Sequence, residues 1–155
     1  MKFIKSSIVL AVLAAGGVAH AASATGQIQL SGSVSQVCTI AVTPTAKATN
    51  LDILTGETAA VVGTVTEDCN AGNGYTVSLT SANAGKLTSS ATGSTPTNYT
   101  AAYDNGTGSI ATKITADRNS HQFGRQGQVQ VSFAGNSQAV AGSYTDTLNI
   151  VIAAK

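Results

Sequence analysis

Few side chains of this sequence are suited to catalysis, and they lie far apart. Glu67 and Asp68 are adjacent acids, and two carboxylates can act as general acid and base when they face each other across a substrate. Neighbouring residues of a strand point to opposite faces of a sheet, so these two could not easily share a substrate. His121 lies in a polar stretch, residues 118–122, that is typical of a surface loop. We therefore expect no enzyme activity, no catalytic residue, no metal site and no cofactor.

The N-terminus has the pattern of a secretion signal. Lys2 and Lys5 precede an apolar run at 8–15, and residues 19–21 fit the small-residue rule for cleavage. The apolar run is short for a membrane span. We predict that residues 1–21 are a signal peptide and that the mature protein is exported; an uncleaved anchor is the alternative.

Cys38 and Cys69 are the two cysteines of the chain. An even number of cysteines in an exported protein is typical of disulfide bonding. A bridge between them would stabilise the fold by roughly 3–4 kcal/mol, because it restricts the unfolded chain. A zinc site would need further ligands at close spacing, and His121 is the only histidine beyond the predicted signal peptide. We expect one disulfide between Cys38 and Cys69.

The composition is unusual in its low charge. Charged residues make up 10% of the chain, against roughly a quarter in typical domains. The formal net charge is +1, which gives no basic surface of the kind that binds nucleic acid. Such a surface has little like-charge repulsion, which would suit a subunit that packs against copies of itself. A secreted protein of low charge would have the same composition.

Short strands are the elements expected to position these residues. The predicted strands are 34–43, 60–69, 75–81, 99–103, 109–116, 128–133 and 143–153. Asn- and Gly-containing turns separate them, and these residues adopt the positive φ angles that tight hairpins need. Residues 84–94 and 119–127 are expected to be loops, and the Thr-rich segment 45–49 is expected not to be helical. Tyr99 and Tyr103 share one strand face and are expected to pack rather than to bind sugar. The pattern predicts an all-β sandwich.

The segment 26–34 alternates strictly, with apolar residues or Gly at even positions and Gln or Ser at odd positions. Period-two alternation predicts a strand with one buried face. This is unusual so close to a mature N-terminus, which is normally frayed and polar. We therefore expect the segment to dock, on its own domain or on another copy.

The last predicted strand alternates as well. Tyr144, Leu148, Ile150 and Ile152 fall on one parity, and Val151 interrupts the polar residues of the other. This pattern predicts an antiparallel strand with one buried face.

Three motifs in this order carry a resemblance to a known family. They are the segment 26–34 with Cys38 after it, the sequence 66–70 followed by 75–79, and the closing sequence 141–150. Together they resemble the major subunits of chaperone–usher pili (fimbriae), and the last is most similar to the archaic branch with its spore coat protein U-like relatives. The match covers both ends and the first half of the mature chain.

The resemblance implies an incomplete immunoglobulin-like β-sandwich of about six to seven strands, completed in trans by an N-terminal donor strand. It implies a signal peptide at 1–21, a donor-strand extension at 22–36 and a pilin domain at 37–155. In such pilins a periplasmic chaperone first lends a strand to a groove beside the last strand. At the outer-membrane usher, the extension of the next subunit replaces that strand.

Carried over by position, the resemblance assigns two sets of site residues. The donor residues would be Ile28, Leu30, Gly32 and Val34. The acceptor groove and chaperone contact would be formed by Tyr144, Leu148, Ile150 and Ile152. Many pilins have an aromatic residue near the C-terminus, whereas no aromatic residue follows Tyr144 here.

The function that the resemblance implies is that of a structural pilus subunit, which polymerises by donor-strand exchange and supports adhesion. The expected partners are other copies of the chain, a periplasmic pilus chaperone and an outer-membrane usher, with no nucleic acid. The expected route is through the periplasm to the cell surface. The alternative is a self-complete secreted β-sandwich that binds a ligand or a cell surface. The two differ in whether residues 26–34 pair within their own domain.

Overall fold

The computed structural model describes residues 23–155. The predicted signal peptide, 1–21, lies outside the described residues. The chain divides between Ser33 and Val34 into two units, and each is described by itself. Residues 23–33 form no strand or helix, whereas Val34–Lys155 is a folded unit.

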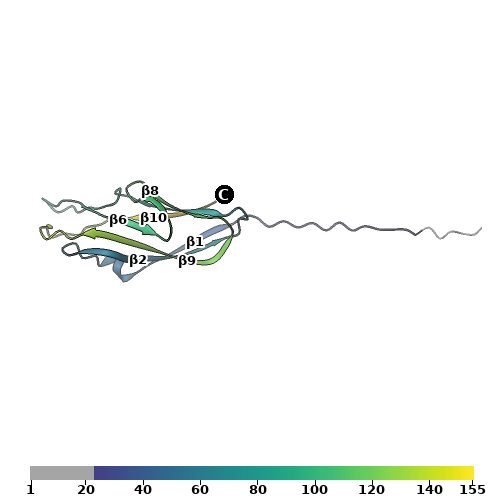
Figure 1. Ribbon diagram of the computed structural model, residues 1–155, viewed down its shortest axis with the longest axis horizontal. Helices are drawn as coiled ribbons and strands as arrows, with labels where there is room; N and C mark the ends of the chain where they lie inside the picture. The colour runs from purple at the N-terminus through teal and green to yellow at the C-terminus, as the bar shows by residue number, and fades with distance from the viewer. Residues whose placement is uncertain (1–22) are drawn as a thin grey trace, which may run out of the picture. The chain divides into compact units, whose positions relative to one another are not determined.

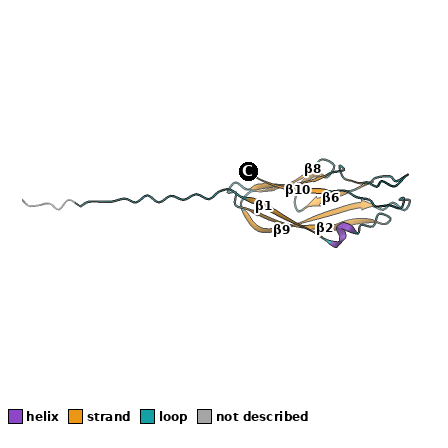
Figure 2. Cartoon of the chain, turned by 180° about the vertical axis from the view of Figure 1, so that it is seen from behind, coloured by secondary structure: helices purple, strands orange, loops and turns teal. Residues whose placement is uncertain are grey.

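Ten strands and one 3-10 helix make up the folded unit (Figure 1). In chain order they are β1 Cys38–Pro44, η1 Ala46–Thr49, β2 Gly56–Cys69, β3 Tyr75–Ser81, β4 Lys86–Leu87, β5 Thr97–Asn98, β6 Thr100–Tyr103, β7 Thr107–Ser109, β8 Lys113–Arg118, β9 Gln122–Ala134 and β10 Leu148–Ala154. Figure 2 shows η1 as the single helical turn among strands and loops.

The strands form two antiparallel sheets that share one core. The first sheet has the order β1-β2-β9-β6 and the second has the order β10-β3-β8-β7, while β4 and β5 form a separate pair. In Figure 1, β2 and β9 lie in one layer and β8 and β10 in the other. Buried apolar residues of both sheets form a single cluster between them. The prediction of an all-β sandwich of the immunoglobulin-like kind is therefore confirmed.

The core is fully buried under the central strands, but it is partly exposed along the side between β1 and β10. The central strand β3 buries Tyr75, Val77 and Leu79 completely, since every second residue of a strand points to the same face. In the edge strands β1 and β10, the inward-facing residues are only partly buried, although they pack against the same cluster; these residues are Cys38, Ile40, Leu148, Ile150 and Ile152. The side of the sandwich between these edge strands therefore lacks a cover.

Several boundaries differ from the sequence prediction. The predicted loop 119–127 contains the first half of β9, whose Arg125 pairs with Glu67 across the sheet. The predicted strand 109–116 is a hairpin, because the chain turns at 110–112 between β7 and β8. The segment 45–49, expected to be non-helical, holds the one-turn helix η1. β9 extends because it pairs with β2 along its length, and Thr45, just before η1, is held by hydrogen bonds to Val61 and Val62 of β2. The hairpin is a local pairing of β7 with β8.

Candidate functional site

A groove runs along the open side of the sandwich. β1 is the last strand of one sheet and β10 is the last strand of the other. Between them lies a cavity of about 700 Å³. Its walls are mostly apolar and include Val42, Leu51 and Ile53 on the β1 side and Tyr144, Leu148 and Ile150 on the β10 side. We call this cavity the acceptor groove.

The free edge of β10 presents its peptide groups to the groove. Thr147 O accepts a hydrogen bond from Ala82 N at 2.9 Å, and Lys155 N donates to Gly74 O at 3.0 Å. Both bonds belong to the register in which β10 pairs with β3. The odd-numbered residues of β10 therefore bond to β3, and the even-numbered residues direct their peptide groups to the opposite edge.

Three even-numbered residues of β10 also point their side chains inward. Leu148, Ile150 and Ile152 are half-buried, whereas Asn149 and Val151 between them are exposed. No strand of the described part of the chain pairs with this edge of β10. At three alternate positions, an apolar side chain and a peptide group without a strand partner are thus available to a further strand.

The free edge of β1 forms the opposite wall. Thr45 N donates to Val62 O at 3.0 Å in the β1–β2 register, so the odd-numbered residues of β1 bond to β2. The even-numbered residues Cys38, Ile40 and Val42 therefore direct their peptide groups to the groove side.

The two ends of β1 are covered to different extents. Ile40 is half-buried, but Val42, two residues further along the same face, is 48% exposed. Pro44 has no N–H group, so the far end of this edge cannot donate a hydrogen bond. The uncovered part of the groove is thus the half farther from Cys38. Because Pro44 cannot donate a hydrogen bond, the edge of β10 is better suited than the edge of β1 to pair with a further strand.

A polar cluster fixes the wall that leads into β10. Asp146 shares the inward parity of Leu148, and its carboxylate accepts hydrogen bonds from Ser81 Oγ at 2.5 Å, Tyr99 OH at 2.6 Å and Asn83 N at 3.0 Å. Burial by itself would raise the pKa of Asp146, but these hydrogen bonds outweigh it and hold the pKa below its usual value. The groove wall is therefore anchored to the β3–β4 hairpin.

The predicted acceptor residues lie at this groove. Tyr144, Leu148 and Ile150 line it, and Ile152 packs against the core at the closed end of β10 without lining the cavity. Tyr144 precedes β10, and its OH donates to Val140 O at 3.0 Å.

The predicted donor residues form a row without cover. The side chains of Ile28, Leu30 and Val34 are 89%, 91% and 89% exposed. A Cβ atom added at Gly32 would meet no atom within 4 Å. Exposed apolar side chains at alternate positions of one segment are typical of a surface that another protein covers.

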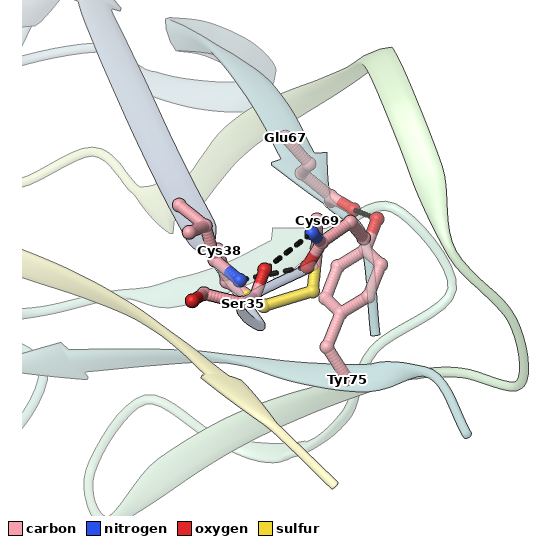
Figure 3. Close-up of a disulfide and its surroundings, with 7 residues drawn as sticks. Ser35, Cys38, Glu67, Cys69 and Tyr75 are labelled. Carbon is pink, nitrogen blue, oxygen red and sulfur yellow. Dashed lines mark hydrogen bonds between the residues drawn. A yellow bond between two sulfur atoms is a disulfide. The ribbon is translucent and has the colours of Figure 1, made fainter. Parts of the chain in front are cut away.

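A disulfide joins the first two strands at the closed end of the groove. Cys38 and Cys69 are register partners in β1 and β2, and their sulfur atoms are bonded (Figure 3). The bridge ties the edge strand β1 to the central part of its sheet.

Beside the disulfide is a buried charge that the sequence did not reveal. Glu67 is completely buried, and it accepts hydrogen bonds from Tyr75 OH at 2.6 Å, from Tyr103 OH, and from Arg118 Nε and Nη2 (Figure 3 shows Glu67 and Tyr75). Burial by itself would raise the pKa of Glu67, but these donors outweigh it and lower the pKa. Burial, together with the hydrogen bond that each donates to Glu67, raises the pKa of Tyr75 and Tyr103. The carboxylate is enclosed, so its role is structural.

The remaining candidates for chemistry lie on the surface or stand alone. Asp68 points away from Glu67, as predicted, and its carboxylate accepts from Gly124 N at 2.7 Å. The exposed His121 ring packs against Phe123, with ring centres 5.9 Å apart. Among residues 23–155, no cluster of His, Cys, Asp or Glu could hold a metal ion. Within the same residues, no helix is long and apolar enough to cross a membrane.

Comparisons with known proteins give little further information. No family model matches the chain, and no curated protein matches it. One matching solved structure is the Hda pilus minor tip subunit HdaB of E. coli, with 10% sequence identity and a TM-score of 0.43. The match covers 74% of this chain and 79% of that chain. A likeness at this identity and TM-score supports no argument about function.

Proposed function

We propose that this protein is an exported structural subunit of a surface pilus and that it polymerises by donor-strand exchange. Residues 26–34 of one copy would lie in the acceptor groove of the next copy and pair with the free edge of β10. The observation that carries the proposal is the groove itself, which is apolar and open between the edge strands β1 and β10.

The donor segment has the periodicity that this groove requires. Ile28, Leu30 and Val34 are apolar at alternate positions, as are Leu148, Ile150 and Ile152 of β10. An added strand gains main-chain hydrogen bonds along the edge and fills pockets with every second side chain. Complete burial of each large donor side chain would contribute about 1.5–3 kcal/mol. Gly32 would lie where the groove leaves no room for a side chain.

The other expected partners follow from the same geometry. An uncovered apolar edge strand is a template for aggregation, so the newly exported subunit needs a temporary cover. A periplasmic pilus chaperone would supply it, and the outer-membrane usher would be the place of exchange. The protein would act by assembly and support adhesion at the cell surface, without enzyme activity and without binding nucleic acid.

The test compares the mature chain, residues 22–155, with a chain that lacks residues 22–34. On a non-reducing gel without boiling, the mature chain should give a ladder of polymers. The shortened chain should give none, yet it should bind a synthetic peptide of residues 26–34. A peptide with Ile28→Ser and Leu30→Ser is the matched control and should not bind. Polymers of the shortened chain would contradict the proposal, and a single monomer band for both would favour a self-complete sandwich.

A further inference from the structure

The side chain of Asn70 holds the chain just before β1. Val37 N donates to Asn70 Oδ1 at 2.7 Å, and Asn70 Nδ2 donates to Ser35 O at 2.8 Å. In addition, Asn70 N donates to Val37 O at 3.1 Å, which continues the β1–β2 register one pair beyond Cys38 and Cys69. Ser35 thus lies beside the disulfide, as Figure 3 shows.

Within residues 23–155, the backbone of residues 35–37 makes one further hydrogen bond, the one that Val37 O accepts from Asn70 N. They belong to neither sheet, all three are exposed, and Val37 is 55% exposed. The two side-chain hydrogen bonds of Asn70 therefore determine whether these residues continue the line of β1 or turn away from it.

This matters because only residues 35–37 separate the donor segment from β1. The acceptor groove runs along β1, so residues 26–34 can enter the groove of their own domain only if the chain reverses direction at 35–37. A three-residue hairpin loop is ordinary in length, so chain length does not prevent this reversal. The reversal would, however, carry Ser35 O away from Asn70 Nδ2.

Insertion into the same domain would compete strongly with assembly. A segment joined by a short linker has an effective concentration of the order of millimolar, above that of separate subunits in dilute solution. A subunit that polymerises through residues 26–34 therefore needs a feature that disfavours insertion in cis.

We infer that Asn70 is a specificity-determining residue, which keeps residues 35–37 in line with β1 and so directs the donor segment to a second copy. The inference rests on the proposed donor-strand exchange. Loss of both side-chain hydrogen bonds should shift the ratio of cis-inserted to open monomer by about tenfold, since each contributes a severalfold preference.

The experiment uses the mature chain with Asn70→Ala, with Asn73→Ala as the matched control. Asn73 lies in the same turn and is exposed, and no hydrogen bond of its side chain occurs within residues 23–155. Each protein is denatured and refolded at one concentration with the disulfide intact. Size exclusion gives the ratio of monomer to polymer, and hydrogen exchange with mass spectrometry gives the protection of residues 26–34 in the monomer.

Asn70→Ala should raise the monomer fraction, and the amides of residues 26–34 should become protected in that monomer. The wild type and Asn73→Ala should polymerise, and their monomers should exchange freely in this segment. Asn70→Asp keeps the acceptor for Val37 N but loses the donor to Ser35 O, so it should shift the ratio in the same direction by less. If Asn70→Ala fails to fold, the monomer fraction and the protection of residues 26–34 are measured on Asn70→Asp instead.

Two kinds of failure can be told apart. If the wild type polymerises and both Asn70 variants polymerise equally well with unprotected monomers, the role of Asn70 is wrong and donor-strand exchange stands. If the wild type forms no polymer and its monomer already protects residues 26–34, insertion in cis is the native state and both proposals are wrong.

Discussion

Arg118 donates hydrogen bonds from Nε and Nη2 to the two carboxylate oxygens of Glu67, at 3.0 and 2.8 Å, inside the sandwich. Arg118 is 5% exposed and Glu67 is not exposed at all. This pair joins β2 of one sheet to β8 of the other beside the disulfide. The closed end of the domain is thus held by charge as well as by apolar packing.

Replacement of Glu67 should destabilise the domain strongly. Glu67→Gln removes the buried counter-charge of Arg118 and leaves only Asp104, a partly exposed carboxylate 3.1 Å from Arg118 Nη2. Breaking one partner of a buried pair costs about 3–5 kcal/mol. Urea denaturation of the oxidised protein measures the free energy of unfolding. Asp68→Asn removes a negative charge from the next residue, outside the core, and should cost less than about 1 kcal/mol. Equal effects of the two changes would contradict the structural role of the Glu67–Arg118 pair.

The stability of the domain should fall in acid. The pKa values of Glu67 and Asp146 are lowered from their usual 4.5 and 3.8. A carboxylate with a lowered pKa in the folded state stabilises it fully above the usual pKa, and this contribution is lost as the pH falls through the folded-state value. The unfolding free energy, measured from pH 7 to pH 2, should therefore decline below about pH 4.5. Glu67→Gln should decline less steeply, and an unchanged slope would contradict the assignment.

The disulfide should contribute to stability without defining the fold. Cys38 and Cys69 are 31 residues apart in sequence, and closing a loop of this length stabilises a domain by roughly 3–4 kcal/mol. Thiol titration of the denatured, unreduced protein should find no free thiol. The urea midpoint should fall after reduction. Two free thiols in the unreduced protein would contradict the bridge.

Gly32→Ile should prevent assembly and leave the domain folded. No atom lies within 4 Å of a Cβ at Gly32, so the subunit itself has no clash to relieve. In a filled groove, a branched side chain would meet packed atoms and disrupt the register of the donor strand. Ser31→Ile is the matched control, because its side chain would point out of the groove. Normal yields of polymer from Gly32→Ile would rule out a tight pocket at this position.

The sequence predicted β3 with its observed bounds, 75–81, and it predicted the alternation of the groove strand. The groove strand is shorter than predicted, since β10 is Leu148–Ala154 and the predicted strand was 143–153. Tyr144, Leu148, Ile150 and Ile152 follow a strict two-residue period, and the structure gives all four the same half-buried environment. Tyr99 and Tyr103 pack in the core, as predicted from their shared face. Such local alternation is visible without knowledge of the neighbouring strands.

The features that the sequence missed depend on contacts between distant residues. The burial of Glu67 follows from Arg118, which lies 51 positions away. Its only local signal is that Glu67 shares the inward parity of Val65 and Cys69. The start of β9 at Gln122 is polar and has no apolar alternation, so the sequence predicts a loop there. Its strand structure comes from pairing with β2.

Donor-strand exchange requires that residues 26–34 complete the sandwich when they lie in the acceptor groove. Its most direct test is a chain that lacks residues 22–34 at its start and carries residues 26–34 behind Lys155 through a short flexible linker. The same fusion with Ile28→Ser and Leu30→Ser is the control. Donor-strand completion predicts that the first fusion is a monomer with a much higher urea midpoint than the control. Equal midpoints for the two fusions would contradict it.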